Sequence, residues 1–502
     1  DSSDSQCHIT VFEKERIFGG RLRSVHLAFG GTGAGTEELS SEQRELHDSD
    51  EAFQADSDQL ESDVAAWSDE KRASSGWFDA GGSIIVSDNR FLKKLADTAK
   101  VTLLSESEFA KKVVGRQGAT VITSAAGEVF RDSTWSWISA IKAAWRYGPL
   151  NMYRLISRVN DVVRDFSSMC DRLEQGECYD SVEALMGPSL FQLTQRCFVD
   201  ALLECTHSTD AKSNDFDQLP LVLKELVECA VRCNYTQSQL TMNAFGGFIG
   251  LTPLALGSES TLLAKTFASI PRRLLRQFRD DPDTTLEAQL DNEVSHIELL
   301  ADGVRLTHSG GSDVFDHVVL CAPLSTAQLR DITGIVDCTE TRTFRRVFVN
   351  FVDGTLKEHS QRDVNEILFC DKFDIRTEET REDAPCIVHG LGTKLVHDSE
   401  TRRICKFFTT PCPATQEVLD SLFESVHWHR VVAFDAYPRF VCPETFLPFD
   451  LTSLMPTPYE DQIHKRRVLY ANTIEHSASA MEMSCVAARN CANLLLRHWA
   501  QT

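Results

Sequence analysis

The chain has 502 residues, of which 42% are hydrophobic and 25% are charged, and its formal net charge is −23. This composition is typical of a globular protein long enough to form two domains. The strong negative charge argues against nucleic acid or an anionic membrane as a main partner. No run of about 18 apolar residues occurs, so the sequence predicts no transmembrane span.

The first motif covers residues 9–22, where a short apolar segment ends in Glu13 and a loop leads to Gly19-Gly20-Arg21. We predict a buried strand at residues 9–12 whose terminal carboxylate accepts hydrogen bonds from ribose hydroxyls. The two glycines let backbone amides approach a dinucleotide, and Arg21 brings positive charge to its phosphates or flavin. This pattern is typical of the second half of an FAD-binding motif. The alternative is a plain strand, a turn and a surface glutamate.

The first half of that motif should precede it as a strand, a G-x-G-x-x-G turn and a helix. Only residues 1–8 precede the strand, whereas these elements need about 30 residues. We therefore expect the chain to begin inside a nucleotide-binding domain, with any signal peptide lost from this sequence. Residues 30–35 are Gly-Gly-Thr-Gly-Ala-Gly, but Thr36 replaces the third glycine and no apolar helix follows. We interpret residues 30–75 as a flexible acidic insertion, and the alternative is that residues 30–35 are the true phosphate loop.

The middle of the chain contains a second double glycine, Gly81-Gly82, which we interpret as another close approach of backbone to a flat cofactor or as a plain turn. Residues 133–244 show helical periodicity with aromatic stripes, which favour a core and could also line an apolar pocket. The pattern of residues 286–307 predicts a strand, a turn and further strands. We expect Val294 to lie near an adenine. Residues 345–351 and 404–410 predict strands of a second sheet.

The C-terminus predicts a strand at 467–472, a turn of small residues and a helix at 481–499. Free amides and the positive dipole end of this helix are expected to face a cofactor. Sixteen cysteines show no C-x-x-C spacing and no accompanying histidine set, so we predict free thiols and no metal site. Asn234 starts a glycosylation sequon. The residues of the turn that we expect at the cofactor are Glu475, Ala478, Ser479, Ala480 and Met481.

Several of these motifs together resemble the prenylcysteine oxidase (prenylcysteine lyase) family. Two departures stand out: Thr473 occupies a usual glycine position, and residues 258–260 replace a Gly-Gly stretch. The segments that carry the resemblance are residues 9–22, 79–83, 145–148, 234–238, 243–245, 319–324, 436–438 and 472–484.

The resemblance implies an α/β fold with a Rossmann-like FAD-binding domain, truncated at its N-terminus, and a helical and mixed-sheet substrate domain. The FAD-binding domain would comprise residues 1–29, 76–132, 270–330 and 460–502, and the substrate domain residues 133–269 and 331–459. FAD would contact Glu13, Gly19, Gly20, Arg21, Gly81, Gly82, Val294, Glu475, Ala478, Ser479, Ala480 and Met481.

The implied reaction is oxidation of a thioether. FAD takes a hydride from the prenyl carbon next to sulfur of farnesyl- or geranylgeranylcysteine, water adds, and the adduct splits into cysteine and a prenyl aldehyde. Molecular oxygen then reoxidises the flavin and yields hydrogen peroxide. No protein base is needed, so no catalytic residue is assigned. The family is lysosomal in animals, which implies the lysosome or secretory pathway. The alternatives are another flavin oxidase of the amine-oxidase type and a flavin-free pseudoenzyme.

Overall fold

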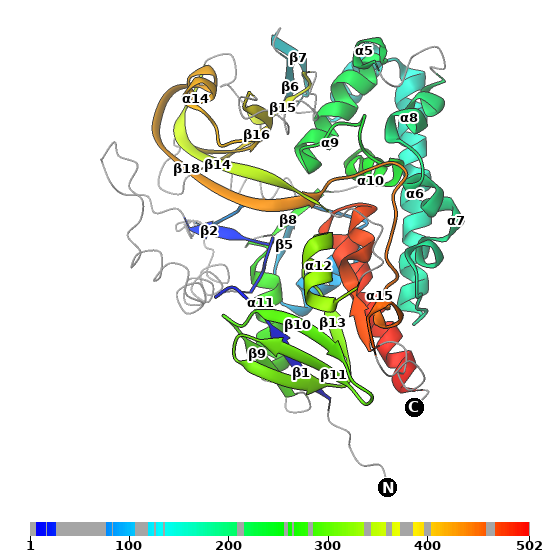
Figure 1. Cartoon of the computed structure of the whole chain (residues 1–502). Coiled ribbons are helices and arrows are strands. Elements are labelled where there is room, and N and C mark those ends of the chain that lie inside the picture. The colour runs from blue at the N-terminus through cyan, green and yellow to red at the C-terminus, as the bar shows by residue number, and fades with distance from the viewer. Residues whose placement is uncertain are drawn as a thin grey trace.

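The computed structural model has a mixed α/β fold with two parts, an upper sheet with helices and a lower nucleotide-binding-like part (Figure 1). None of the described helices is both long and apolar enough to cross a bilayer. The predicted insertion at residues 30–75, Ser83 and residues 258–259 lie outside the described residues. The structure describes residues 7–16, 18–26, 77–82, 84–105, 119–124, 127–133, 136–207, 215–255, 260–263, 266–279, 285–335, 343–357, 364–371, 385–395, 403–457 and 467–500.

The upper part is built on a seven-stranded sheet of order β18-β14-β17-β16-β15-β6-β7, antiparallel except where β15 pairs with β6. One face packs Val352, Cys405 and Phe407 against helix α14 (Gln416–Leu422). The opposite face contributes Val349 and Phe351 to a separate core. The strands are β6 (Ala119–Ser124), β7 (Gly127–Arg131), β14 (Phe344–Leu356), β15 (Val364–Phe369), β16 (Ile387–Leu395), β17 (Arg403–Thr410) and β18 (Phe423–Pro438).

This sheet confirms the strands expected at residues 345–351 and 404–410, and it corrects one predicted domain boundary. Residues 76–132 were assigned to the nucleotide-binding domain, yet β6 and β7 belong to the seven-stranded sheet. The error arises because β6 pairs with β15, more than 200 residues later in the chain, and local patterning carries no information on such pairing. The rest of the domain division stays a prediction.

The lower part contains two parallel strand pairs, β1 (His8–Phe12) with β9 (Thr285–Gln289) and β13 (Val318–Leu320) with β19 (Val468–Tyr470). No strand of the described residues joins β1 to β13. The strand expected at residues 9–12 is present as β1, but it is not buried, since Ile9 is 45% exposed. The other lower strands are β2 (Ser24–His26), β3 (Trp77–Asp79), β4 (Ile85–Val86), β5 (Leu103–Ser105), β8 (Ser260–Leu263), β10 (Val294–Leu299), β11 (Val304–His308) and β12 (Gly311–Phe315).

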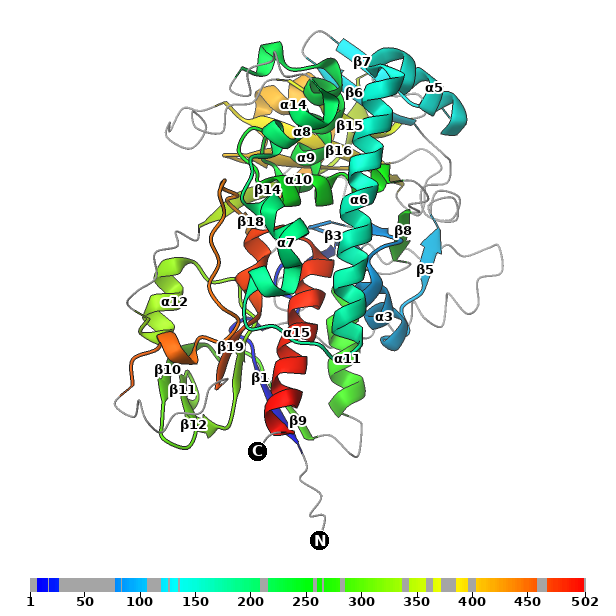
Figure 2. The same cartoon turned by 90° about the vertical axis from the view of Figure 1, so that its right-hand side faces the viewer.

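A layer of helices carries the largest core, and its longest member, α6 (Pro149–Glu174), runs beside the C-terminal helix α15 (Met481–Trp499) (Figure 2). Proline at the first turn of α6 is tolerated because that position needs no amide donor. Its buried residues Leu155, Val159 and Val162 recur at helical spacing. The other helices here are α5 (Ser136–Tyr147), α7 (Val182–Thr194), α8 (Phe198–Thr206), η2 (Phe216–Gln218), η3 (Val222–Val227), α9 (Glu228–Tyr235), α10 (Ala244–Gly250) and η4 (Thr252–Leu254).

The aromatic stripe expected in the core is only partly buried. Leu155 and Tyr147 are buried, whereas Trp145 is 91% exposed and Tyr153 is 70% exposed. Helical periodicity identified α5 correctly, but it did not tell which side of the helix faces the protein. The remaining helices are α3 (Arg90–Thr98), α11 (Ser269–Arg279), α12 (Thr326–Thr333), η6 (Thr452–Leu454) and η7 (Ala471–His476).

Candidate functional site

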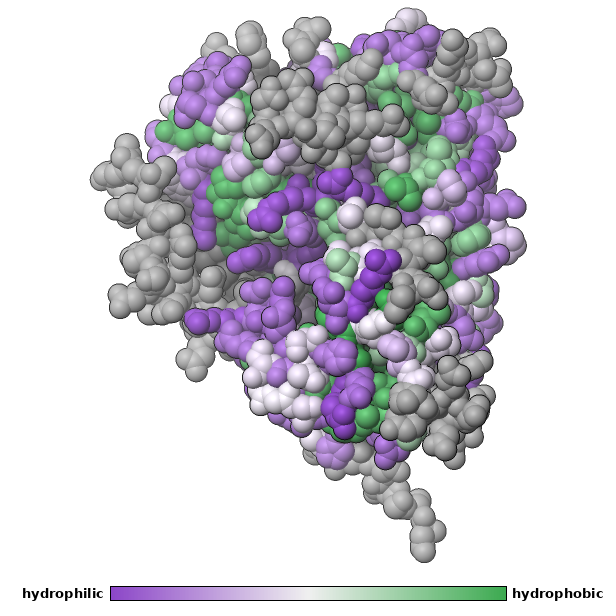
Figure 3. All heavy atoms as spheres, viewed as in Figure 1, coloured by the Kyte–Doolittle hydropathy of each residue, from purple (hydrophilic) through white to green (hydrophobic). Residues whose placement is uncertain are grey.

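One cavity of about 4140 Å³ extends between the lower part and the inner face of the seven-stranded sheet. It is several times larger than the ~300–1,000 Å³ of ordinary small-molecule pockets, so it has room for a dinucleotide and a second molecule. Apolar side chains gather over β14 and β18 on the face shown in Figure 3. The predicted cofactor residues that line this cavity are Glu13, Gly19, Gly20, Arg21, Gly81, Gly82, Val294, Glu475, Ser479, Ala480 and Met481.

Ala478 is the exception among the predicted cofactor residues. It is fully buried in the helical core and does not line the cavity. The small side chain therefore serves packing behind the cavity wall, and its prediction as a cofactor contact is corrected.

Glu13 lies where β1 ends, next to the turn that leads from β9 to β10. Its backbone N–H donates to the Gln289 carbonyl at 2.9 Å, and its carbonyl accepts from the Asn292 N–H at 3.0 Å. One carboxylate oxygen accepts from the Glu15 N–H at 3.0 Å. Val294 opens β10 and lines the same end of the cavity. This end therefore offers a carboxylate beside an apolar side chain, the pair of groups that suits a ribose and an adenine.

Gly19 and Gly20 form a turn that requires glycine. Their φ angles are +135° and +53°, which L side chains rarely adopt, and the Leu22 N–H closes the turn onto the Gly19 carbonyl at 2.8 Å. A Cβ on Gly19 would lie 3.2 Å from the Leu22 carbonyl oxygen, whereas a Cβ on Gly20 would meet no atom within 4 Å. The turn thus presents bare backbone to the cavity and directs Arg21 inward.

Arg21 and Glu475 form an ion pair across the cavity wall, joining residues 454 positions apart. Arg21 also donates to the Ala436 carbonyl at 2.8 Å, and Ser479 Oγ donates to Glu475 Oε1 at 2.8 Å. Glu475 is nearly buried, with its side chain 5% exposed. Its second oxygen, Oε2, is buried and accepts no hydrogen bond within the described part of the chain.

The surroundings of Glu475 Oε2 show whether the site fits a flavin dinucleotide. A buried carboxylate oxygen without a donor is costly, so its position in a cavity indicates a bound group that donates a hydrogen bond. The hydroxyls of a ribityl chain are donors of this kind. The residues present therefore fit the middle of an FAD molecule as well as its ribose end.

The helix α15 begins at this point with its amides uncapped. Its N-cap is Ala480, which has no side-chain acceptor, and Ser479, Ala480 and Met481 line the cavity. Unpaired N–H groups and the positive end of the helix dipole favour oxygen atoms that carry negative charge. The predicted turn thus faces the cavity through its last three residues.

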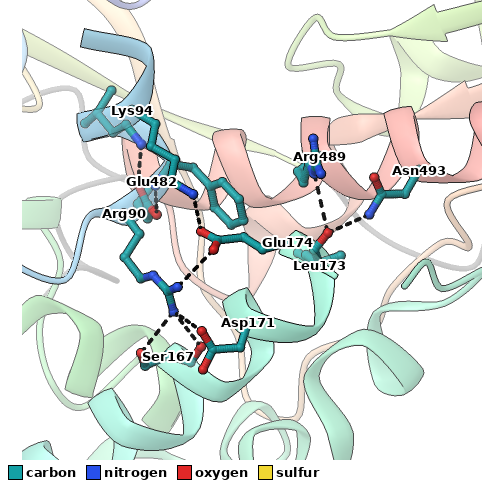
Figure 4. A network of polar contacts seen from close by, with 11 residues as sticks. Arg90, Lys94, Ser167, Asp171, Leu173, Glu174, Glu482, Arg489 and Asn493 are labelled. Atoms are coloured by element: carbon teal, nitrogen blue, oxygen red, sulfur yellow. Dashed lines mark hydrogen bonds and ion pairs between the residues drawn. The ribbon is translucent and has the colours of Figure 1, made fainter. Parts of the chain in front are cut away.

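Glu482, one residue further on, fixes α15 to its neighbours. Its two carboxylate oxygens accept from the Phe91 and Leu92 N–H groups at 2.8 Å each, so it caps the N-terminus of α3 from another helix. Arg90 of α3 pairs with Asp171 and Glu174 of α6 at 2.6 and 3.1 Å (Figure 4). The start of α15 is therefore held by α3, which is itself tied to α6.

Gly81 and Gly82 lie on the sheet side of the cavity and are held by Lys406 of β17. The Lys406 ammonium donates to the Asp79 and Gly81 carbonyls at 2.7 and 2.5 Å. A Cβ on Gly82 would meet no atom within 4 Å, so its backbone faces open space. Sequence reasoning missed Lys406, although a lysine within the otherwise apolar run of residues 404–408 was the sign that could have revealed it.

The far end of the cavity is apolar and aromatic. Tyr235 and Tyr437 meet edge to face with ring centroids 5.7 Å apart, and Phe408 and Phe434 also line this end. Burial raises the pKa of both tyrosines, which keeps them neutral. No group of three metal-ligating side chains occurs among the described residues. This end offers an aromatic surface against which a hydrocarbon tail can pack.

Two sequence features have a local structural role. Thr473 is fully buried, and its hydroxyl donates to the Leu447 carbonyl, so the fold accommodates threonine at this position. The amide nitrogen of Asn234 donates to the Gly250 carbonyl at 2.9 Å, and Asn234 lines the cavity.

Comparison with known proteins identifies the family. The family model described as prenylcysteine lyase matches residues 130–502, which is most of the chain. The chain belongs to the prenylcysteine lyase family. It is 28% identical to farnesylcysteine lyase of Arabidopsis thaliana over 432 residues, covering 84% of this chain and 77% of that protein. It is 23% identical to prenylcysteine oxidase 1 of Homo sapiens over 454 residues, covering 84% and 79%.

Solved structures show the fold of this prenylcysteine lyase family member. The CLA-producing fatty acid isomerase from P. acnes matches with a TM-score of 0.51 at 13% identity, covering 84% of this chain and 87% of that chain. Cyclohexylamine oxidase from Brevibacterium oxydans IH-35A has a TM-score of 0.49 at 12% identity. The match to the isomerase supports the expected α/β architecture in outline, while contact of the lining residues with a flavin stays a prediction.

Proposed function

We propose that this member of the prenylcysteine lyase family is an FAD-dependent thioether oxidase that cleaves farnesyl- or geranylgeranylcysteine to cysteine, a prenyl aldehyde and hydrogen peroxide. One observation carries the proposal. The predicted cofactor residues, apart from Ala478, line a single cavity that continues to an aromatic end on the seven-stranded sheet. Family membership adds the class of substrate.

The chain's own residues would hold the cofactor along its length. Glu13 would accept the ribose hydroxyls, Glu475 Oε2 would accept from the ribityl chain, and the first amides of α15 would face the flavin ring oxygens. The glycines at 19–20 and 81–82 leave bare backbone where the cofactor passes. When bound, the flavin supplies the hydride acceptor for the carbon next to sulfur.

The substrate end would contribute orientation and exclusion of water. The neutral Tyr235 and Tyr437 side chains would form an apolar wall for the prenyl tail together with Phe408 and Phe434. Burying a farnesyl chain of roughly 14 apolar carbons at about 0.8 kcal/mol each gives on the order of 10 kcal/mol before the cost of ordering. Affinity should therefore fall as the prenyl chain shortens.

The test is anaerobic stopped-flow mixing of the purified, FAD-loaded protein with farnesylcysteine, geranylcysteine and S-methylcysteine. We expect flavin bleaching in that order of efficiency, with aldehyde and peroxide formed on admission of oxygen. Bleaching by putrescine or cyclohexylamine but not by farnesylcysteine would instead assign an amine oxidase. A protein that takes up no FAD would be the flavin-free alternative.

We also propose a lysosomal or secretory location, which follows from the family resemblance. Fractionation of cells that express the full coding sequence tests it. Co-migration with a lysosomal marker is expected, and recovery with cytosolic markers would contradict it.

A further inference from the structure

Two cysteines meet at one end of the β16–β17 strand pair, where β16 begins and β17 ends. The last opposed residues at this end are Ile387 of β16 and Thr410 of β17. Cys386 comes directly before β16, and Cys412 follows two residues after the end of β17. The strand register thus brings together two cysteines that are 26 positions apart in the sequence.

The Cys386 thiol points toward the segment that carries Cys412. Its Sγ donates to the Cys412 carbonyl at 3.7 Å and to the Pro413 carbonyl at 3.5 Å. The Cys412 side chain is also a hydrogen-bond partner of this thiol. Burial raises the pKa of the Cys386 thiol, and the neighbouring Cys412 raises it further, so Cys386 stays protonated. The two side chains are therefore in contact as well as close in register.

The segment with Cys412 is held in place from its other side. The Cys412 carbonyl also accepts from Thr409 Oγ1 at 2.8 Å, and the Ala414 N–H donates to Asn350 Oδ1 at 3.0 Å. Asn350 is fully buried on β14, so it anchors this segment to the middle of the sheet. Both cysteines are half-buried, and a small solute can reach them. They thus combine fixed proximity with access, as formation of a disulfide requires.

We propose that Cys386 and Cys412 are a modification site, at which hydrogen peroxide converts the two thiols to a disulfide. One sulfur attacks the peroxide and becomes a sulfenic acid, and the first water leaves; the other sulfur then displaces the remaining oxygen as a second water. Both thiol protons leave in these waters, so two thiols are oxidised and one peroxide is reduced. The described cysteines are free thiols, and the structure is thus that of the reduced pair.

The disulfide would join the two strands that form the sheet side of the cavity. Gly390 and Gly392 of β16 and Lys406 and Phe408 of β17 line this side. A link between the ends of the two strands restricts the unfolded chain and stabilises the folded one. The inference goes beyond the proposed function, although the reaction proposed there would release the oxidant at this protein. Oxidation would then strengthen the cavity wall.

Peptide mapping tests the link directly. Trypsin releases Cys386 in the peptide 382–394 and Cys412 in the peptide 407–430, and each peptide contains one cysteine. The full chain is reduced, treated with a small excess of hydrogen peroxide, alkylated and digested without reductant. We expect one linked species, about 2 Da lighter than the two peptides together because two hydrogens are lost. Recovery of both peptides unlinked, or of Cys386 linked to another cysteine, would overturn the proposal.

A second arm measures stability in urea. Peroxide treatment should shift the unfolding midpoint of wild type upward, and Cys386→Ser and Cys412→Ser should each lose this shift. Cys205→Ser is the matched control and should keep it, because Cys205 is also half-buried and its thiol donates to the Arg154 carbonyl at 3.3 Å. A shift that persists in Cys386→Ser would overturn the stabilising role of the pair.

The two proposals fail separately, because the peroxide in both arms is added. A linked pair in a protein that oxidises no thioether would leave the disulfide intact and overturn the proposed function. An unlinked pair in a protein that oxidises farnesylcysteine would overturn the disulfide alone.

Discussion

The cavity wall carries two charged pairs, and the two pairs are built differently. At the cofactor end Arg21 and Glu475 touch, and Arg21 is further bound to the Ala436 carbonyl. At the sheet end Lys406 and Glu366 lie two strands apart, with Gly392 between them. The first pair joins segments far apart in the chain, and the second follows from strand register.

The two pairs therefore differ in the groups that they can offer to a ligand in the cavity. A touching pair neutralises itself, so it can offer a ligand only a residual hydrogen-bond acceptor such as Glu475 Oε2, which suits an uncharged hydroxyl. At the sheet end the Lys406 ammonium is held by the Asp79 and Gly81 carbonyls, so its charge fixes the segment that carries Gly81 and Gly82 beside the cavity. Four substitutions test the roles of these residues.

The largest effect is expected from Glu475→Ala. Removing one partner of a buried pair leaves the other charge uncompensated and costs about 3 kcal/mol, the low end of the usual range because the Arg21 side chain is 26% exposed. FAD retention should fall with it. Urea unfolding and flavin release report the two effects. The double variant Arg21→Met/Glu475→Ala should recover part of the stability, and strict additivity would contradict a direct pair.

Glu13→Ala tests the part of the cofactor end that lacks an ion pair. Loss of a charged acceptor for the ribose hydroxyls should weaken FAD binding by about 1.5–3 kcal/mol, or roughly 10- to 150-fold. Fluorescence titration of the apoprotein with FAD measures this change. Glu15→Ala, on the exposed neighbouring carboxylate, is the control. Unchanged affinity in Glu13→Ala would show that Glu13 is not the ribose acceptor.

Gly392→Val would place a side chain between Lys406 and Glu366, because opposed side chains lie about 5 Å apart across strands. Gly392 lines the cavity, so the added side chain would narrow the sheet end. We expect KM for farnesylcysteine to rise about tenfold, the equivalent of about 1.4 kcal/mol. Steady-state kinetics measures this change, and urea unfolding checks that the sheet is intact. An unchanged KM would show that the substrate does not reach this end.

The smallest effect concerns Glu482, which holds α15 at the cofactor end. Burial raises the pKa of Glu482 above its ordinary value, and hydrogen bonds from the Leu92 and Phe91 amides oppose this. A raised pKa means that the folded state binds the proton more tightly, so its contribution is present below pH 4.5 and is lost as pH rises. Relative to Glu482→Gln, the free energy of unfolding of wild type should therefore fall between pH 4.5 and 7. A rise over this range would contradict the assignment.

The cofactor end could be predicted from the sequence because its parts are local. Each part is encoded by a few consecutive residues: a strand that ends in Glu13, a glycine turn at positive φ, and a helix preceded by small residues. Only Ala478 was misplaced, since its neighbours face the cavity while it packs inward. The predicted helix at residues 481–499 corresponds to α15.

The residues at the sheet end of the cavity are brought together only by the tertiary structure. Glu366, Gly392 and Lys406 are separated by more than a dozen residues from one another, and only the register of three strands places them in one row. The pairing of β6 with β15 and the outward side of α5 depended in the same way on which distant surface each element met. Residue spacing encodes the period of an element and the chemistry of its turns, but the partner of a face is set by the packing of the whole chain.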